Sequence, residues 1–79
     1  MELNEKLTQL RKKKGITQAE LAEEMQVSRQ AVSKWESGSS IPSIENLRGL
    51  SELYSVHVDY LLNEEDEEEE SILQEPTDN

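Results

Sequence analysis

A short window between Ser28 and Lys34 contains side chains that can form paired hydrogen bonds with flat, polar partners. Arg29 and Gln30 stand side by side, and Ser33 and Lys34 follow four residues later. In a helix, this spacing places all four side chains toward one side. Guanidinium and ammonium groups suit the acceptor edge of guanine, and a carboxamide suits adenine. The window is therefore a candidate for reading bases in the major groove of DNA, with a merely solvent-exposed helix face as the alternative.

The sequence lacks the residue combinations of common catalytic and metal sites. It contains no Cys and a single His, His57. No nucleophile–base set, cluster of metal ligands or phosphate-binding loop can be recognised. We therefore expect no enzymatic activity, no metal and no cofactor, and we expect His57 to be a surface or helix-capping residue.

The distribution of charge is more informative than the total, which is −10 for 79 residues. All eight Lys and Arg residues fall in residues 1–62 with nine of the 18 Asp and Glu residues, so this part is close to neutral. The other nine acidic residues fall in residues 63–79, where there is no base. We therefore predict a domain over residues 1–62 that can still bind an anionic partner, and a disordered acidic tail over residues 63–79.

The sequence gives no indication of export or of a membrane span. Its longest apolar runs are two or three residues, whereas a membrane-spanning helix needs roughly 20. The first residues, Met-Glu-Leu-Asn, lack the basic and then apolar pattern of a signal peptide. We expect a cytoplasmic protein that does not bind a membrane.

Apolar spacing predicts a first helix that ends at Gly15. Leu3, Leu7 and Leu10 form one helical stripe. Four basic residues at 11–14 occupy the last turn, where cations suit the helix dipole. Gly15 then provides a C-terminal stop.

Two short helices follow, separated by a tight turn. Thr17 and Glu20 fit a capping box at the start of the first, which ends near Gln26. Ser28 can cap the second, whose apolar face is Ala31, Val32 and Trp35 and which stops at Gly38. Such a pair packs near a right angle and presents its second helix outward.

The remaining residues of the domain predict a loop and two further helices. Residues 38–43 have loop composition, and Ser43 can cap the next helix. The apolar face of that helix is expected to comprise Ile44, Leu47, Leu50, Ser51 and Tyr54, and a last short helix contains Val58, Leu61 and Leu62. The prediction is an all-α domain of five helices.

Three strings within this pattern resemble a known family. They are LRKKKGITQAELA at 10–22, VSRQAVSKWESG at 27–38 and VDYLL at 58–62. Residues 7–62 resemble the phage-repressor-like Xre/Cro family, which implies a helix-turn-helix from Thr17 to Trp35. The resemblance implies sequence-specific binding of double-stranded DNA and regulation of transcription, more often by repression than by activation. It also implies a homodimer on a near-palindromic operator whose half-sites lie about one DNA turn apart.

The resemblance also implies roles for individual residues. Gln18 would grip a phosphate at the start of the second helix, and the loop after Gly38 would offer main-chain N–H groups to phosphates, with Ser37 and Ser39 as neighbours. Base-facing and backbone-facing positions would be filled by Ser28, Arg29, Gln30, Ser33 and Lys34.

Several side chains have a second interpretation. Arg11 matches a family pair with Glu36, which we prefer to a phosphate contact. Lys34 could hold a phosphate instead of a base, and Trp35 could stack on a base, although its spacing indicates a core residue. The lysines at 12–14 could attract DNA or simply solvate the end of a helix.

Three residues depart from the family pattern. Gln26 stands where a Gly is common, and a positive φ there would cost roughly 1 kcal/mol. Ser55 and His57 replace a Gly and a Ser cap between the last two helices, a region that often forms the dimer contact.

The acidic tail leaves function partly open. It could be a solvated end, a competitor for the basic face that suppresses non-specific DNA binding, or a docking segment for a basic protein partner. A toxin partner would make the chain an antitoxin, and a lost sensor domain would make the tail a linker. An enzyme is the least favoured class.

Overall fold

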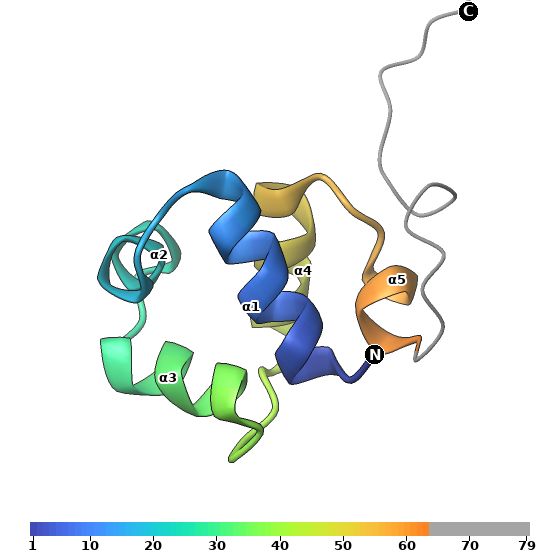
Figure 1. Cartoon of the computed structure of the whole chain (residues 1–79), viewed down its shortest axis with the longest axis horizontal. Coiled ribbons are helices and arrows are strands. Elements are labelled where there is room, and N and C mark those ends of the chain that lie inside the picture. The colour runs from blue at the N-terminus through green and yellow to red at the C-terminus, as the bar shows by residue number, and fades with distance from the viewer. Residues whose placement is uncertain (64–79) are drawn as a thin grey trace, which may run out of the picture.

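The computed structural model describes residues 1–63, and these residues form five helices (Figure 1). The helices are α1 (Leu3–Lys14), α2 (Gln18–Met25), α3 (Arg29–Ser37), α4 (Ile44–Tyr54) and α5 (Val58–Leu62). The expected all-α architecture is confirmed for this part of the chain. None of these helices has the length and apolarity to cross a membrane. The acidic segment 64–79, with the predictions that concern it, lies outside the described residues.

The ends of α1 and α2 follow the local chemistry of the sequence. Gly15 ends α1 with φ 78°, and its N–H donates to the carbonyls of Arg11 and Lys12. At the start of α2, Thr17 Oγ1 accepts from the Glu20 N–H at 3.0 Å, while Glu20 Oε1 accepts from the Thr17 N–H at 2.8 Å. The capping box predicted from the sequence is therefore present.

Both ends of α3 are also defined by specific contacts. Ser28 Oγ accepts from the Ala31 N–H at 3.0 Å, which satisfies one of the free donors at the start of the helix. Gly38 ends α3 with φ 85°, and a Cβ at this position would lie 3.6 Å from the Asn4 side chain on α1. Since 3.6 Å is an ordinary contact distance, the left-handed backbone angle, and not a lack of space, is what favours Gly at this position.

Two of the residues that depart from the family pattern, Gln26 and Ser55, end helices in left-handed backbone. Ser43 Oγ accepts from the Asn46 N–H at 3.2 Å and begins α4. Ser55 ends it with φ 58°, and Gln26 ends α2 with φ 59°. Both departures from Gly thus occur in left-handed backbone. His57 is exposed at the N-cap of α5, and its side chain makes no capping hydrogen bond.

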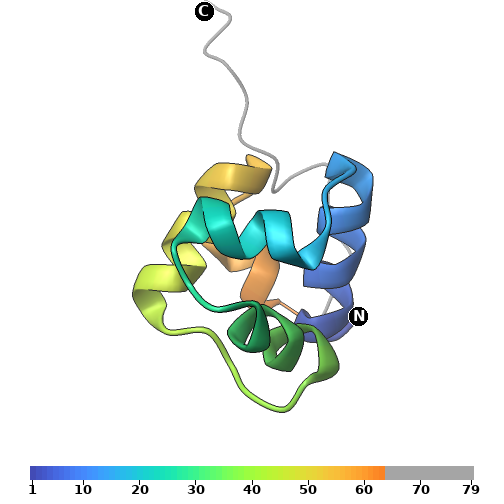
Figure 2. The same cartoon turned by 90° about the vertical axis from the view of Figure 1, so that its left-hand side faces the viewer.

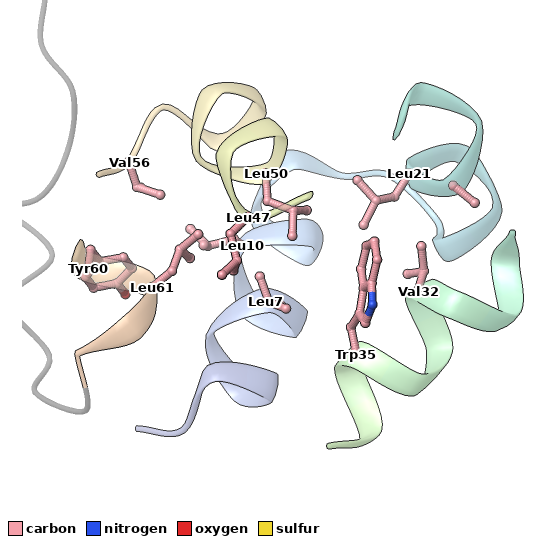
Figure 3. Close-up of a cluster of buried hydrophobic side chains, with 11 residues drawn as sticks. Leu7, Leu10, Leu21, Val32, Trp35, Leu47, Leu50, Val56, Tyr60 and Leu61 are labelled. Atoms are coloured by element: carbon pink, nitrogen blue, oxygen red, sulfur yellow. The ribbon is translucent and has the colours of Figure 1, made fainter. Parts of the chain in front are cut away.

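The core lies between α1 and the other four helices (Figure 3). Leu7 and Leu10 of α1 occupy its centre, and Trp35 packs beside Leu21 and Val32 on one side. Trp35 is 5% exposed, so the prediction that it is a core residue is confirmed. The other buried apolar side chains are Ala22, Leu47, Leu50, Val56, Tyr60 and Leu61.

Two apolar positions were assigned wrongly from periodicity. Ile44 is 63% exposed, because the first turn of α4 lies at the edge of the bundle (Figure 2). Leu62 is 54% exposed because Tyr60 and Leu61 already fill the buried side of the short α5. Both residues continue the apolar pattern of their helices in the sequence, but no other helix of the described residues covers them.

A buried lysine joins α1 to α5. The apolar spacing of the sequence did not predict its burial. Lys6 is fully buried. Its Nζ donates to the Tyr60 carbonyl at 2.5 Å and to the Asn63 carbonyl, and it lies 4.4 Å from the centroid of the Tyr60 ring. A cation at the carbonyl end of a helix is favoured by the helix dipole, so Lys6 stabilises the C-terminal end of α5.

Candidate nucleic-acid interface

The outer face of α3 consists of exposed polar side chains. Arg29, Gln30, Ser33 and Lys34 are all exposed. Within residues 1–63, none of these four side chains takes part in a hydrogen bond or ion pair within the protein. Their hydrogen-bonding groups are therefore available to a ligand, at the spacing predicted from the sequence.

The inner face of α3 fixes how that outer face is presented. Val32 is fully buried and Trp35 is 5% exposed, and both pack against α1 and α2. Because these two residues lie on the side of the helix opposite Arg29, Gln30 and Ser33, burial of one face exposes the other. Packing against α1 and α2 thus holds α3 at the surface of the domain (Figure 2).

The Ser28 hydroxyl caps α3 and can also donate a hydrogen bond to a ligand. Its Oγ is an acceptor for the Ala31 N–H at the start of α3, yet the residue is exposed. The hydroxyl hydrogen can therefore still be donated outward, for example to a phosphate or a base acceptor.

Gln18 lies at the first position of α2 and is held by Glu36. Its Nε2 donates to Glu36 Oε1 at 3.0 Å, and the side chain is half-buried. The second hydrogen on Nε2 is left for another acceptor. This contact orients Gln18 toward α3.

Arg11 and Glu36 form a two-point ion pair between α1 and α3. Arg11 Nε lies 2.7 Å from Glu36 Oε2, and Arg11 Nη2 donates to Glu36 Oε1 at 3.1 Å. The side chains are 13% and 5% exposed. Arg11 Nη1 also donates to the Ile16 carbonyl at 2.9 Å. The hydrogen bond to Glu36 raises the pKa of Arg11 above its ordinary value, and these contacts leave Arg11 occupied within the protein.

Three main-chain donors at the start of the loop after α3 are used within the protein. The N–H groups of Gly38, Ser39 and Ser40 all point to the Lys34 carbonyl. Ser37 Oγ also donates to this carbonyl at 3.2 Å and lies 2.9 Å from Ser39 Oγ. Ser37 and Ser39 are exposed, so their hydroxyls remain near the surface.

Two N–H groups in the same loop remain available for a ligand, and the sequence did not show which ones they would be. Pro42 has no N–H, and the N–H groups of Ile41 and Ser43 make no hydrogen bond among the described residues. The N–H groups of the three residues before Ile41 already donate to the Lys34 carbonyl at the end of α3. A sequence pattern does not show this, because it depends on how the chain leaves α3.

Residues 1–63 contain no group of three or more His, Cys, Asp or Glu side chains placed to hold a metal ion. The candidate site is a surface built from the outer face of α3, the start of α2 and the loop after α3.

Comparison with known proteins places this arrangement in a family. The family model described as "Helix-turn-helix" matches residues 7–61. The chain belongs to the helix-turn-helix family. Its phage-repressor-like type is supported by a solved structure, the P22 c2 repressor in complex with synthetic operator 9T. That structure matches with a TM-score of 0.77 at 37% identity, over 82% of this chain and 98% of the other.

Curated relatives of this helix-turn-helix chain are transcription regulators with different outputs. The chain is 53% identical over 66 residues to the HTH-type transcriptional activator BcrR of Enterococcus faecalis, a match that covers 84% of this chain and 32% of BcrR. It is 33% identical over 75 residues to the cryptic phage CTXphi transcriptional repressor RstR of Vibrio cholerae, over 92% of this chain and 67% of RstR. The chain thus spans about a third of BcrR and two thirds of RstR.

Proposed function

We propose that this chain binds double-stranded DNA in a sequence-specific manner and regulates transcription, with α3 in the major groove. The observation that supports this most is the polar face of α3, whose hydrogen-bonding side chains are exposed and unused within residues 1–63. Arg29 and Gln30 are the residues proposed to read bases, since arginine pairs with guanine and glutamine with adenine. Ser33 and Ser28 are placed beside them.

Phosphate contacts would surround this reading surface. Lys34 lies one turn beyond Gln30 and supplies either a base contact or a phosphate contact. Gln18 would hold a phosphate through the Nε2 hydrogen that Glu36 does not use. In the loop, the hydroxyls of Ser37 and Ser39 and the N–H groups of Ile41 and Ser43 are the proposed donors. Such contacts set orientation and register, while base contacts set specificity.

The assembly on DNA would be a homodimer on a near-palindromic operator. Two copies related by a two-fold axis place two α3 helices in successive major grooves, about one helical turn apart. We infer that the chain acts in the cytoplasm, where it has access to bacterial DNA.

Repression is the proposed output, by occupation of promoter DNA. It is supported by the likeness to RstR and to the P22 c2 repressor, each named as a repressor. Activation is a second candidate, because BcrR is named as an activator. A reporter gene with the selected operator placed either over or upstream of its promoter separates the two outputs.

Selection of bound sequences from a random DNA pool tests the proposal. The wild-type chain should yield a palindromic consensus. Arg29→Ala and Gln30→Ala should each weaken binding to that consensus by about 1–3 kcal/mol, or roughly 5- to 150-fold, and relax the preference at one position per half-site. Arg48→Ala and Gln9→Ala are matched controls, since both residues are exposed on other helices. Unchanged affinity in both α3 variants would refute the assignment of α3 as the reading helix.

A further inference from the structure

A groove lies between the last turn of α1 and the connection from α4 to α5. Its volume is about 330 Å³. Its apolar wall is formed by the half-buried Leu53 and Tyr54, with the buried Leu10 and Val56 beneath them. Lys13 and Lys14 contribute two ammonium groups. No acidic residue and no residue of α2 or α3 lines it. The groove therefore combines apolar surface with positive charge.

Other hollows of the domain have the opposite charge. One between α2 and α4 is lined by Glu24, Glu45 and Glu52. A second, beside α2, is lined by Glu20, Glu23 and Glu24. An acidic segment would be repelled from both and attracted to the groove beside Lys13 and Lys14.

The chain itself contains a segment with the complementary chemistry. Residues 64–70 are seven consecutive acidic residues, and Ile72 and Leu73 follow them. We propose that residues 64–73 dock in this groove, with carboxylates beside Lys13 and Lys14 and with Ile72 and Leu73 against its apolar surface.

The attachment point of the segment allows this docking. The carbonyl of Asn63 accepts a hydrogen bond from Lys6 on α1. Lys13 and Lys14 lie about 10–12 Å further along the same helix, at 1.5 Å per residue. Ten residues reach at most about 36 Å when extended, so the segment spans the gap in either extended or compact form. Because the segment is tethered, its effective concentration at the groove is in the millimolar range, and weak surface ion pairs suffice.

Docking at this groove has a consequence for the rest of the surface. It places the acidic segment beside Lys13 and Lys14, at a groove that no residue of α3 lines. Arg29 and Lys34 on α3 are then not covered by the acidic segment. This proposal does not depend on DNA binding, and it differs from competition of the tail for the α3 face.

Zero-length crosslinking of the full chain tests it. A water-soluble carbodiimide joins a lysine amine to a carboxylate only where the two are in contact. Mass spectrometry of the monomeric product should place most crosslinks between residues 64–70 and Lys13 or Lys14. The double variant Lys13→Gln/Lys14→Gln should lower the yield of crosslinked monomer by about fivefold, as expected for two surface ion pairs.

A matched variant and two further conditions make the test specific. Lys12→Gln/Lys34→Gln also removes two exposed lysines, but neither residue lines the groove, so this variant should crosslink like the wild type. Ile72→Ser/Leu73→Ser should lower the yield although every carboxylate is kept. Raising NaCl to about 0.5 M should also lower it, because the Debye length falls to about 4 Å.

Three results would overturn the proposal. The first is an equal distribution of crosslinks over Lys12, Lys13, Lys14 and Lys34. The second is a preference for Lys34, which would indicate that the segment covers α3. The third is crosslinking mainly between mixed heavy- and light-labelled chains, which would make a second copy the acceptor.

Discussion

The ammonium group of Lys6 lies 4.4 Å from the centre of the Tyr60 ring and donates to the Tyr60 carbonyl at 2.5 Å. This contact joins the first turns of α1 to the last helix, 54 residues away in sequence. A buried lysine would ordinarily be costly. Here the carbonyls at the end of α5 and the face of an aromatic ring replace part of its hydration.

Lys6→Met should therefore destabilise the domain although it keeps most of the buried aliphatic volume. The loss of hydrogen bonds from a charged group should lower the free energy of unfolding by about 1.5–3 kcal/mol. Urea unfolding followed by circular dichroism measures this. Lys12→Met, on an exposed position of the same helix, should change stability by less than about 0.5 kcal/mol. Equal effects of the two substitutions would contradict the role assigned to Lys6.

The Arg11–Glu36 pair should contribute more than a surface ion pair. Arg11→Met leaves the Glu36 carboxylate, 5% exposed, with Gln18 as its remaining side-chain partner. We expect a loss of about 2–3 kcal/mol, compared with at most about 1 kcal/mol for an exposed pair. A double-mutant cycle with Glu36→Leu isolates the coupling energy. A coupling near zero would show that the two residues stabilise the fold independently.

Tyr54 should make the domain sensitive to alkaline pH. Burial raises the pKa of its phenol above the ordinary value, the negative charge of Glu36 adds to this, and Arg11 partly offsets it. The unfolded chain ionises near pH 10, while the folded chain keeps the neutral phenol. Stability is therefore fully present below about pH 10 and falls as the pH rises further. Thermal unfolding at several pH values measures this slope.

Tyr54→Phe provides the control for that slope. The Tyr54 hydroxyl is buried without a hydrogen-bond partner among the described residues, so its removal should leave stability at neutral pH unchanged or raise it by up to about 1 kcal/mol. The variant should also show a shallower decline above pH 10. A marked loss at neutral pH would indicate that the hydroxyl has a structural partner.

Gln26 and Ser55 should be sites where glycine stabilises the fold. They have φ values of 59° and 58°, which cost an L-residue about 1–2 kcal/mol. Gln26→Gly and Ser55→Gly should each raise the free energy of unfolding by about 0.5–1 kcal/mol after the greater flexibility of glycine in the unfolded chain is included. Gly15→Ala is the reciprocal control. Its φ is 78° and a Cβ would meet nothing within 4 Å, so a loss of stability there would come from the backbone angle alone.

The sequence was sufficient for features that depend on neighbours along the chain. The capping box of Thr17 and Glu20, the serine caps and the glycine stops follow from local hydrogen bonds and backbone angles. The polar face of α3 also followed from spacing. Ile44 was misassigned because periodicity shows which residues share a stripe but not where the covering helices end.

Features that depend on the tertiary arrangement could not be predicted in this way. Lys6 looked like any polar residue of an amphipathic helix, and its burial depends on where α5 ends. The use of the Ser39 and Ser40 N–H groups by the Lys34 carbonyl depends on the path of the loop. The Gln18–Glu36 hydrogen bond depends on how α2 and α3 are placed relative to each other.

The division of α3 into two faces has a consequence for how such a domain can evolve. Arg29, Gln30 and Ser33 are exposed, whereas Val32 and Trp35 belong to the buried core. Substitutions on the outer face can therefore accumulate with little cost in folding, so duplicated copies of the gene can change the surface that we propose to read DNA while keeping one scaffold. Glu36 on the same helix is not part of this outer face: its carboxylate binds Arg11 of α1 and Gln18 of α2, and we expect that position to change less freely.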